Sequence, residues 1–450
     1  MPPKKGEEEV QKKILGRPSV NVSCGIVGMP NVGKSSFFNI LCGMQVPAEN
    51  FPFCTIDPNL SRVIVPDERF DWLVSQFKPR SVVPADLKVT DIAGLVRGAA
   101  EGAGLGNAFL SHIKATDGIF QMVRVFDDAD VIHVEDSVDP IRDMEIIGNE
   151  LRLKDIEFVT AQVAKLAGIV AKQDKTKKKD LDITQKLLEW LQAGHDARHG
   201  DWSNDEIDVL NDYLLLSAKQ TIYLVNMSEP DFIKKKNKWL GKIAEWIKAH
   251  GGDQVIPFSV AFEGKLLDMS PEARAAYCAE VGATSQLPKI IKAGFNALQL
   301  QYFFTAGEDE VRAWTVKKGS KAPEAAGRIH GDMERGFIMA ETMKFEDLRE
   351  LGTEAECKAK GKYTQNGKNY LVQVRFAPPN PFNLHIQFTS IPRPHLIPAS
   401  HFICFRTATS FISNSTSPPR ASKCRCADQI NCFRQQSLSS TAKPTFDSFV

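Results

Sequence analysis

The residues with the clearest chemical potential lie in a glycine-rich segment near the N-terminus. Gly28-Met-Pro-Asn-Val-Gly33-Lys34-Ser35 fits the phosphate-loop pattern G-x-x-x-x-G-K-[ST] without deviation. Its glycines let backbone N–H groups turn inward around phosphate oxygens, and a helix beginning near Lys34 would direct its positive end at the same charge. We therefore expect Lys34 to contact the β- and γ-phosphates of a nucleotide and the Ser35 hydroxyl to bind Mg²⁺.

Two later segments are candidates for the metal side of such a site. Thr55 lies in the polar, proline-flanked stretch ENFPFCTIDPN and is a candidate Mg²⁺ ligand, with a plain loop residue as the alternative. Asp91 begins DIAG at the end of an expected strand and would hold Mg²⁺ through water, while the Gly94 N–H could bond to a γ-phosphate. DxxG is common by itself, so the hypothesis depends on the order of these residues after the loop. The glycine-rich segment 98–106 that follows could order and disorder with the γ-phosphate.

The segment expected to read the base departs from the guanine-binding pattern N-K-x-D. TIYLVN ends in Asn226-Met227-Ser228-Glu229, and the Glu carboxylate lies one methylene further out than that of Asp. Adenine has no N2 amine for this carboxylate to bind, whereas the Asn226 amide or the Met227 carbonyl could meet its N6 donor and N7 acceptor. The sequence thus favours ATP with some use of GTP; a GTPase with relaxed base specificity is the alternative. Ser259 is a weaker candidate for a second base-contacting loop.

The group that would activate water is not the usual one. Many enzymes with this loop carry a Gln directly after DxxG, whereas this chain has Leu95, which cannot orient water. One hypothesis is that Asn31 holds a monovalent cation, K⁺, near the β/γ-bridge in place of an arginine finger. The other is that His112, in LSHIKAT, acts there, with a surface or helix-packing histidine as the alternative. The predicted catalytic residues are Lys34, Gly94 and His112.

The elements around these residues follow the alternation of an α/β protein. A β-rich run over 20–27 leads into the glycine-rich loop, and residues 37–41 then have helical spacing. Four further apolar runs are candidates for buried parallel strands: 87–95, 118–126, 221–227 and 254–260. Their alternation with helical segments predicts a doubly wound sheet of the P-loop NTPase class.

Two other segments have a different pattern of apolar and polar residues. Between about 131 and 205, apolar residues step by three and four as in a heptad seam, at Ile156, Val159, Val163, Leu166 and Val170. This predicts an inserted antiparallel helical hairpin of coiled-coil type; two ordinary amphipathic surface helices are the alternative. The basic run 172–179 is interpreted as a solvated turn. From about Leu300, two strand-like pieces, a Pro/Gly turn and a helix predict a small α+β module.

Composition limits the class of protein. The 450 residues are 43% hydrophobic and 25% charged, with 56 Lys/Arg against 55 Asp/Glu, which excludes a fibrous or mainly disordered chain and gives no polyelectrolyte signal for nucleic acid. No apolar run reaches the length of a membrane span, and the N-terminus lacks a signal-peptide core. Nine scattered Cys favour a reduced intracellular protein. We expect a cytoplasmic monomer, with a nuclear pool as an alternative, and no sequence-specific DNA binding.

Taken together, the motifs resemble the Obg-like ATPases, the YchF branch of the Obg family of P-loop GTPases in the TRAFAC class. The resemblance spans about residues 20–373 and is carried by GMPNVGKSS, ENFPFCTIDPN, DIAGLVRGA, GLGNAFLSHI, VDPIRD, NKWL, LPKIIKAGF, YFFTAGEDEVRAWT and GFIMAE. It implies a P-loop domain with a coiled-coil insertion, a C-terminal TGS-like module of β-grasp form, and hydrolysis of ATP in preference to GTP. It also implies association with ribosomes and roles in translation and stress responses. The ATP contacts that it implies are Asn31, Val32, Gly33, Lys34, Ser35, Ser36 and Met227, with Mg²⁺ at Ser35 and Thr55.

The C-terminal end departs from the family pattern. Family members continue after a segment like Gly367-Lys368-Asn369-Tyr370-Leu371-Val372 with an acidic-glycine turn and a last strand, whereas this chain runs into a stretch without Glu. We interpret residues 374–450 as a divergent, disordered tail from a splice variant, a retained intron or a gene-model error; a basic localisation or membrane-surface tail is the functional alternative. Loss of the last strand would leave the β-grasp module with an unpaired edge.

The expected organisation and function follow from these observations. The domains are a charged extension (1–19), the nucleotide-binding domain (20–130 and 206–280), the helical insertion (131–205), the TGS-like module (281–373) and the tail (374–450). We expect an Mg²⁺-dependent ATPase with slow turnover that acts as a molecular switch. Two alternatives are a true GTPase on the same fold and a non-catalytic adaptor whose shape is set by bound nucleotide.

Overall fold

The computed structural model describes residues 13, 15–16, 23–43, 59–95, 97–98, 106–128, 131, 133–171, 175–372 and 384–387. For 106–110, 175 and 384–387 it describes the backbone alone. Thr55 lies outside the described residues, as do most of the expected extension 1–19 and most of the expected tail 374–450.

The first sheet has six strands in the order β2-β4-β1-β5-β6-β7, and all neighbours are parallel except β2 and β4. The strands are β1 (Ser23–Val27), β2 (Leu60–Ile64), β4 (Asp86–Asp91), β5 (Gly118–Arg124), β6 (Gln220–Asn226) and β7 (Gln254–Phe258). All except β2, which the sequence analysis did not predict, correspond to the expected apolar runs. The β5 strand is buried along its whole length, as a strand covered on both faces must be. The β1 strand lies between β4 and β5, so the loop after β1 emerges where the direction of winding reverses.

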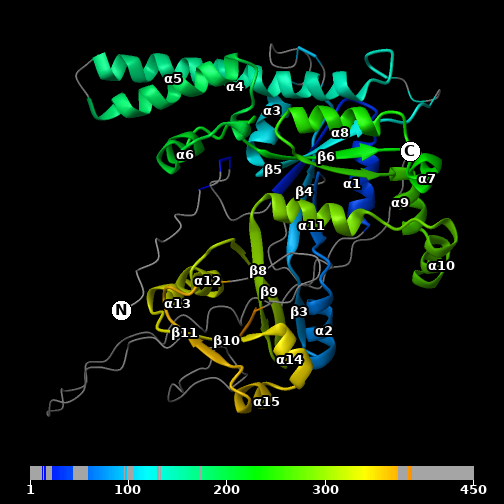
Figure 1. The fold of residues 1–450 in the computed structure, drawn as a ribbon, viewed down its shortest axis with the longest axis vertical. Coiled ribbons are helices and arrows are strands. Elements are labelled where there is room, and N and C mark those ends of the chain that lie inside the picture. Colours follow the sequence, from blue (N-terminus) through cyan, green and yellow to red (C-terminus); the bar gives the residue numbers. More distant parts are fainter. Residues whose placement is uncertain are drawn as a thin grey trace, which may run out of the picture. The chain divides into compact units, whose positions relative to one another are not determined.

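Helices cover both faces of this sheet (Figure 1). The helices near it are α1 (Lys34–Cys42), α3 (Gly106–Ala115), α7 (Glu229–Lys234), α8 (Leu240–Ala249), α9 (Val260–Leu267), α10 (Pro271–Val281) and α11 (Leu287–Ala297). Beside the helical insertion lie α6 (Asn204–Asn211) and the short 3-10 helices η2 (Lys175–Lys177) and η3 (Ala197–His199). One core cluster joins β1 and β5 to α1 and α11, and a second joins β5 and β6 to α8 and α9. This is the doubly wound α/β arrangement that the sequence predicts. No helix of the described part is long and apolar enough to cross a membrane.

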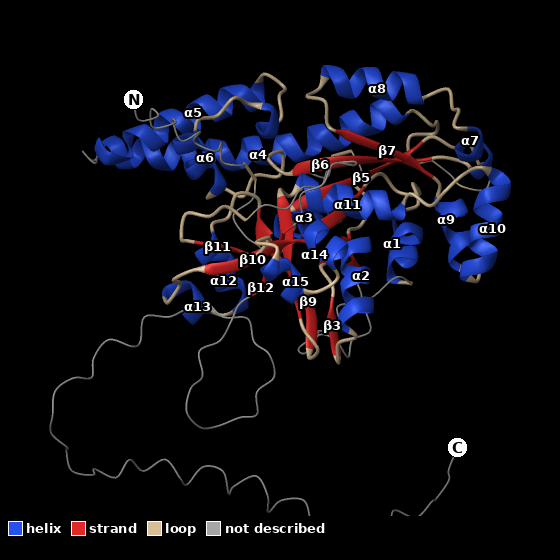
Figure 2. Ribbon diagram, turned by 60° about the horizontal axis from the view of Figure 1, so that its bottom comes forward, coloured by secondary structure: helices blue, strands red, loops and turns tan. Residues whose placement is uncertain are grey.

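The segment expected as an insertion contains α4 (Pro140–Ala171) and α5 (Lys178–Gln192), which lie side by side in both ribbon views (Figures 1 and 2). Val159 and Leu187 are fully buried between these helices and α6, whereas Leu166 and Val170 of the expected seam are half-buried. The first turns of α4 belong to the nucleotide-binding layers, because Ile147 is buried in the same cluster as β1 and β5. The expected boundary at residue 131 therefore precedes residues that pack on the sheet.

The second sheet also has six strands, in the order β11-β10-β12-β8-β9-β3. Its strands are β3 (Ser81–Val83), β8 (Leu300–Ala306), β9 (Glu310–Lys317), β10 (Ala340–Lys344), β11 (Thr364–Asn366) and β12 (Leu384–Gln387), and the nearby helices are α2 (Glu68–Phe77), α12 (Ala322–Ile329), α13 (Gly331–Arg335), α14 (Phe345–Leu351) and α15 (Glu354–Ala359). Two contacts cross the expected domain boundaries. The β3 strand, from the segment 20–130, pairs with β9, and α11, from the segment 281–373, packs against the first sheet.

The expectation that the C-terminal segment is disordered is wrong for four of its residues. Residues 384–387 of the expected disordered tail form β12, which pairs antiparallel with β10 and parallel with β8. The β12 strand therefore lies where we expected the loss of the family's last strand to leave an unpaired edge. The correction applies to these residues alone, because residues 374–383 and 388–450 of the expected tail are outside the described residues.

We predict that Ile386→Pro lowers the free energy of unfolding by about 1–3 kcal/mol, because proline removes a backbone donor and leaves its acceptor unpaired inside a sheet. Thermal and urea denaturation of the full chain would measure the change. Ile386→Val is the matched control, since it keeps the donor and the β-branched side chain. Equal stability of the proline and valine variants would show that β12 does not form.

Candidate nucleotide-binding site

The glycine-rich loop connects β1 to α1 and adopts the conformation that its sequence requires. Gly33 has φ 98°, in the left-handed region, and a Cβ added there would lie 2.8 Å from the Asn226 amide nitrogen. Glycine is therefore required at this position for both backbone and steric reasons. Asn31 also has positive φ, at 61°, and its side chain is exposed. The loop thus turns sharply directly before the first turn of α1, where N–H groups are free to bind an anion.

Lys34 is buried in this loop, and no carboxylate of the described residues is bonded to it. Its Nζ donates to the Met29 carbonyl at 2.8 Å, and burial lowers its pKa to about 8 despite the raising effect of Asp91. Gly94 lies directly against it, since a Cβ on Gly94 would be 3.1 Å from Lys34 Nζ. The two residues predicted to bind the terminal phosphate are therefore neighbours. A buried ammonium with one neutral partner is electrostatically prepared for a polyphosphate.

The oxygen ligands predicted for Mg²⁺ also meet. The Ser35 hydroxyl donates to Asp91 Oδ2 at 2.9 Å. The other carboxylate oxygen, Asp91 Oδ1, is buried and has no hydrogen-bond partner among the described residues. Hydroxyl and carboxylate oxygens are the donors that Mg²⁺ prefers, usually with phosphate oxygens and water completing the shell. The two side chains therefore fit an Mg²⁺ ion, and the orphaned oxygen would gain a partner from its hydration shell.

Asn226 holds the loop in place from the end of β6. Its Nδ2 donates to the Val32 carbonyl at 2.9 Å, and its Oδ1 accepts from the Val260 N–H at 3.0 Å. The amide thereby joins the phosphate loop to the loop that follows β7. We predicted a base contact for Asn226; the interaction that the structure records is this bridge, and the base contact stays a prediction.

The Glu229 carboxylate stands where the guanine-binding pattern has Asp, and two neighbouring side chains donate hydrogen bonds to it. Lys265 of α9 donates to its Oε2, and the Tyr277 hydroxyl donates to its Oε1 at 2.8 Å. Although partial burial raises the pKa of this carboxyl, the bonds from Lys265 and Tyr277 outweigh that effect, and the pKa is lowered overall. Glu229 is therefore ionised at neutral pH and its two oxygens are engaged inside the protein.

The other predicted base contacts are buried. Met227 is 2% exposed and its N–H donates to the Phe258 carbonyl at 2.8 Å. Ser259 is 0% exposed, and its hydroxyl accepts from the Phe262 N–H as the N-cap of α9. The structure gives Ser259 a capping role that the sequence did not reveal, although Ser before an apolar helix is a capping signal. Their contacts with a base stay predictions.

The residues considered for water activation lie in different environments. Leu95 is 1% exposed in the core next to β1, and its N–H donates to the Gly28 carbonyl at 3.1 Å. Its side chain is packed inside the protein and cannot orient water. His112 is exposed on α3, so its catalytic role stays a prediction. Thr55 is outside the described residues and is untested as a metal ligand.

Two contacts that the sequence did not suggest join the segment after DxxG to its surroundings. The Gly98 N–H donates to Glu150 Oε1 of α4 at 2.7 Å, and Arg97 forms a 3.4 Å ion pair with Glu135. Glu150 is buried, at 5% exposure of the residue, so the Gly98 N–H is bonded to a carboxylate that is largely shielded from solvent. No local pattern marks these partners, because they lie 52 and 38 positions apart in the sequence.

The fold and the loop together define a P-loop nucleotide-binding protein of the α/β class. A family model described as "50S ribosome-binding GTPase" matches residues 23–162, and the model YchF-GTPase_C, described as a protein of unknown function, matches residues 300–374. Obg-like ATPase 1 of Oryza sativa subsp. indica is 56% identical over 377 residues, which is 83% of this chain and 96% of that protein. Obg-like ATPase 1 of Homo sapiens is 57% identical over 378 residues, with the same shares of the two chains. The YchF GTPase structure of Schizosaccharomyces pombe matches with TM-score 0.75 and 48% identity, covering 83% of this chain and all of that one.

The chain therefore belongs to the Obg-like ATPase family, the YchF GTPases, as the motifs indicated. The family membership supports nucleotide hydrolysis by this P-loop fold.

We predict that Asn226→Ala weakens ADP binding at least about tenfold and lowers the free energy of unfolding by about 2 kcal/mol, because one buried and one partly buried backbone group lose their partner. Calorimetry and urea denaturation would measure the two effects. Asn237→Ala is the matched control: its amide also bonds to the backbone carbonyl of a buried residue, Val125, at 3.2 Å, but its recorded partners do not include residues 28–35 of the phosphate loop. This control should lose stability and keep ADP affinity. Equal loss of affinity in both variants would contradict the bridging role.

Proposed function

We propose that the protein is an Mg²⁺-dependent ATPase with slow turnover that prefers ATP to GTP and acts as a molecular switch. The observation that carries the proposal is the Lys34, Ser35 and Asp91 arrangement, in which an ammonium and an orphaned carboxylate oxygen converge on one loop. The family membership supports the chemistry of hydrolysis.

Each side chain has a distinct role in this proposal. The loop N–H groups and Lys34 would hold the β- and γ-phosphates, and the Gly94 N–H would bond to the γ-phosphate. Ser35 and Asp91 would hold Mg²⁺, with Thr55 as a third ligand; when bound, the ion neutralises phosphate charge. Because Leu95 is buried, water would be oriented by another group, and Asn31 with K⁺ or His112 are the candidates. A slow intrinsic rate follows from the lack of a glutamine there.

The preference for ATP rests on Glu229. A guanine base would need a carboxylate acceptor for its N1–H and N2 amine, and both oxygens of Glu229 already accept bonds from Lys265 and Tyr277. Breaking these bonds to bind GTP would cost free energy, whereas adenine makes no such demand. Asn226, Met227 and Ser259 are the proposed neighbours of the adenine ring.

The first test compares ATP and GTP. Calorimetry with non-hydrolysable analogues in Mg²⁺ should show tighter binding of the ATP analogue, and ATP turnover should require Mg²⁺. We predict that Glu229→Asp raises the affinity for GTP relative to ATP by about tenfold or more, because the shorter carboxylate leaves Lys265 and Tyr277 and is free to accept from guanine.

Glu245→Asp makes the same chemical change on the exposed face of α8 and should leave the affinity ratio unchanged. Tighter binding of GTP than ATP by the wild-type chain would overturn the proposed preference. Tight ATP binding without any turnover would instead support a non-catalytic adaptor.

The lowered pKa of Lys34 predicts proton uptake on nucleotide binding. In the free protein its pKa is about 8, so part of the population is neutral at about pH 8.5, and a bound polyphosphate restores the charge. Affinity should therefore fall as the pH rises above about 8, and proton uptake by this group should drop to about a tenth of a proton at about pH 7. Calorimetry in two buffers of different ionisation enthalpy would measure the protons.

Lys219→Met is the control for this measurement. The pKa of Lys219 is also lowered to about 8 by burial, but its ammonium bonds to the Lys114 and Thr116 carbonyls at the other end of the sheet. The variant should therefore keep the proton uptake. Loss of proton uptake in the Lys219→Met variant would show that the proton binds to Lys219 and not to Lys34.

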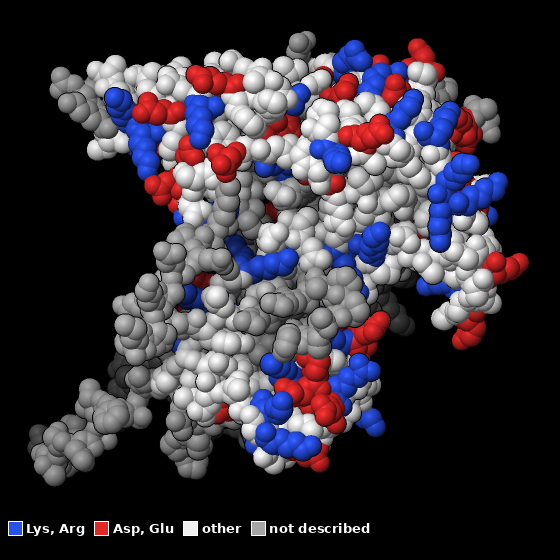
Figure 3. All heavy atoms as spheres, viewed as in Figure 1, with Lys and Arg blue, Asp and Glu red and all other residues white. Residues whose placement is uncertain are grey.

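The finer assignments are also proposals. We propose that α4 and α5 form the coiled-coil hairpin of the family and that the second sheet is its TGS-like β-grasp module. Binding to the ribosome is supported by the description of the matched family model, and a cytoplasmic monomer with a nuclear pool as an alternative is the proposed state. Lys/Arg and Asp/Glu are interspersed on the face drawn in Figure 3, which fits the proposed lack of sequence-specific DNA binding.

A further inference from the structure

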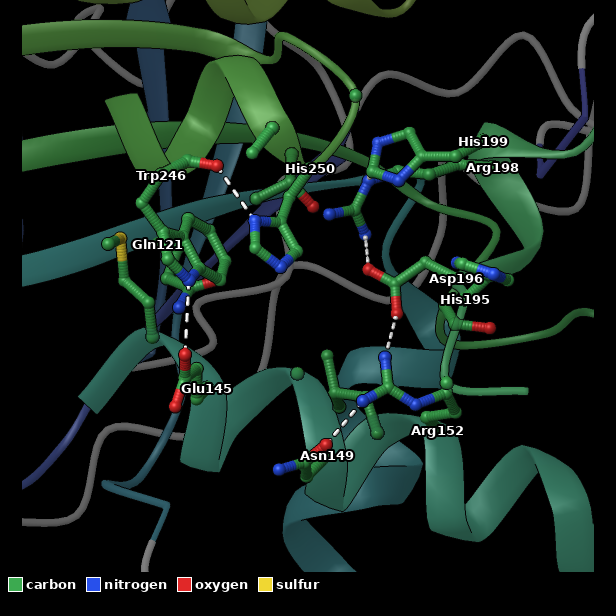
Figure 4. A pocket seen from close by; sticks show the side chains of 18 of the residues that line it. Gln121, Glu145, Asn149, Arg152, His195, Asp196, Arg198, His199, Trp246 and His250 are labelled. Carbon is green, nitrogen blue, oxygen red and sulfur yellow. Dashed lines mark hydrogen bonds and ion pairs between the residues drawn. The ribbon is translucent and has the colours of Figure 1, made fainter. Parts of the chain in front are cut away.

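A second pocket lies away from the nucleotide-binding loop. It has a volume of about 580 Å³ and is bounded by β5, β6, α4, α8 and the turn that contains η3 (Figure 4). None of the residues 28–35, 91–95 or 226–229 lines it. Its volume falls in the range of small-molecule sites, which is about 300–1,000 Å³. The pocket is therefore large enough for a ligand other than the nucleotide of the first site.

The floor of the pocket contains an unpaired donor. Gln121 of β5 lines the pocket and is 4% exposed, and its Nε2 has no hydrogen-bond partner among the described residues. Its side chain shares a sheet face with that of Tyr223, since the two residues are paired across β5 and β6. A buried amide nitrogen without a partner destabilises the free protein, and an acceptor on a ligand would remove that penalty.

The walls of the pocket are flat rings. Trp246 and His250 are stacked, with ring centroids 4.0 Å apart and an interplanar angle of 17°. On another side, Trp190 and His195 lie 4.6 Å apart at 36°. Figure 4 shows His250 and His195 standing on different sides of the pocket. Such ring faces favour a planar ligand, which can stack on them with little loss of conformational freedom.

The cationic side chains of the pocket are paired with carboxylates, and one further carboxylate, Glu145, accepts from Trp246 Nε1 at 3.1 Å. Arg152 bonds to Asp196 at 2.8 Å, and Arg198 pairs with Asp196 and Asp253, both at 3.0 Å. Two guanidinium groups that are bound to carboxylates attract a phosphate weakly, so the pocket suits a neutral ligand rather than an anion. The wall formed by α4 is bare at Gly148, where an added Cβ would meet nothing within 4 Å.

We propose that this pocket binds a neutral heteroaromatic ring of nucleobase type, which stacks on His250 and accepts a hydrogen bond from Gln121 Nε2. A free nucleoside and an unpaired base of single-stranded RNA both present this chemistry. The proposal does not rest on the proposed ATPase activity, because the residues that line this pocket differ from those of the P-loop site.

The test is saturation-transfer-difference NMR, which measures saturation transfer from the full-length protein to the base protons of adenosine, guanosine, cytidine and uridine. The measurement is made in saturating Mg·ADP, so that the P-loop site is filled. A short single-stranded RNA is measured in the same way, so that the two sources of the base are distinguished. Gly148→Leu fills the pocket from α4 and should abolish the transfer. Gly168→Leu is the matched control, because it lies on the same helix, meets nothing within 4 Å and does not line the pocket.

The proposal is supported if the wild type and Gly168→Leu give transfer that Gly148→Leu loses. It is overturned if neither the nucleosides nor the RNA receives transfer, or if transfer is the same in all three proteins.

Gln121→Met separates a ligand contact from a structural role. The variant should melt at a higher temperature, because an unpaired buried donor is gone, and should bind the responsive nucleoside or RNA about tenfold more weakly. A merely structural glutamine would give a lower melting temperature and unchanged binding. That outcome would remove Gln121 from the proposed site.

Discussion

The amide of Asn226 is the interaction on which the geometry of the nucleotide site depends. It connects the Val32 carbonyl of the phosphate loop to the Val260 N–H beyond β7, so that loops from three strands keep one arrangement. The close approach of this amide is also the reason why Gly33 must lack a side chain. Once the loop is held in this shape, Lys34 is buried beside Gly94, and its lowered pKa follows from that burial.

At two positions where a guanine-type hydrolase has a functional Gln or Asp, this protein has a side chain that is used for structure. Leu95 packs into the core while its N–H ties the DxxG segment to Gly28. Glu229 is bonded to Lys265 and Tyr277, which satisfies both oxygens of the only carboxylate in its motif. In each case the side chain at that position contacts the protein interior instead of presenting a polar group to the nucleotide. The engagement of these two side chains inside the protein is the physical basis of the proposed slow turnover and adenine preference.

Helix α4 connects the two candidate ligand sites. Its Glu150 carboxylate accepts from the Gly98 N–H, in the segment that follows the γ-phosphate contact. Two residues earlier, Gly148 forms part of the wall of the second pocket. A rearrangement of Gly98 with nucleotide state would therefore act on a helix that also bounds the second pocket. The same helix continues to Val159, where it packs on α5.

The sequence alone predicted the features that depend on contiguous residues. The loop 28–35, the strands β4 to β7 and the Asp91–Gly94 segment were recognised because turn residues and buried runs determine local backbone conformation. The meeting of Ser35 with Asp91 followed from the motif. The pairing of β3 with β9 and of 384–387 with β8 and β10 had no such signal.

The remaining features were decided by the tertiary structure. Asn226 lies 194 positions from Val32, and Glu229 lies 48 positions from Tyr277, so no local pattern records these bonds. A strand can recruit any compatible sheet edge, and a buried amide or carboxylate takes whichever partner the folded chain brings near. The sequence therefore determined which residues could bind phosphate and metal, and only the packed chain decided which of the others became their supports.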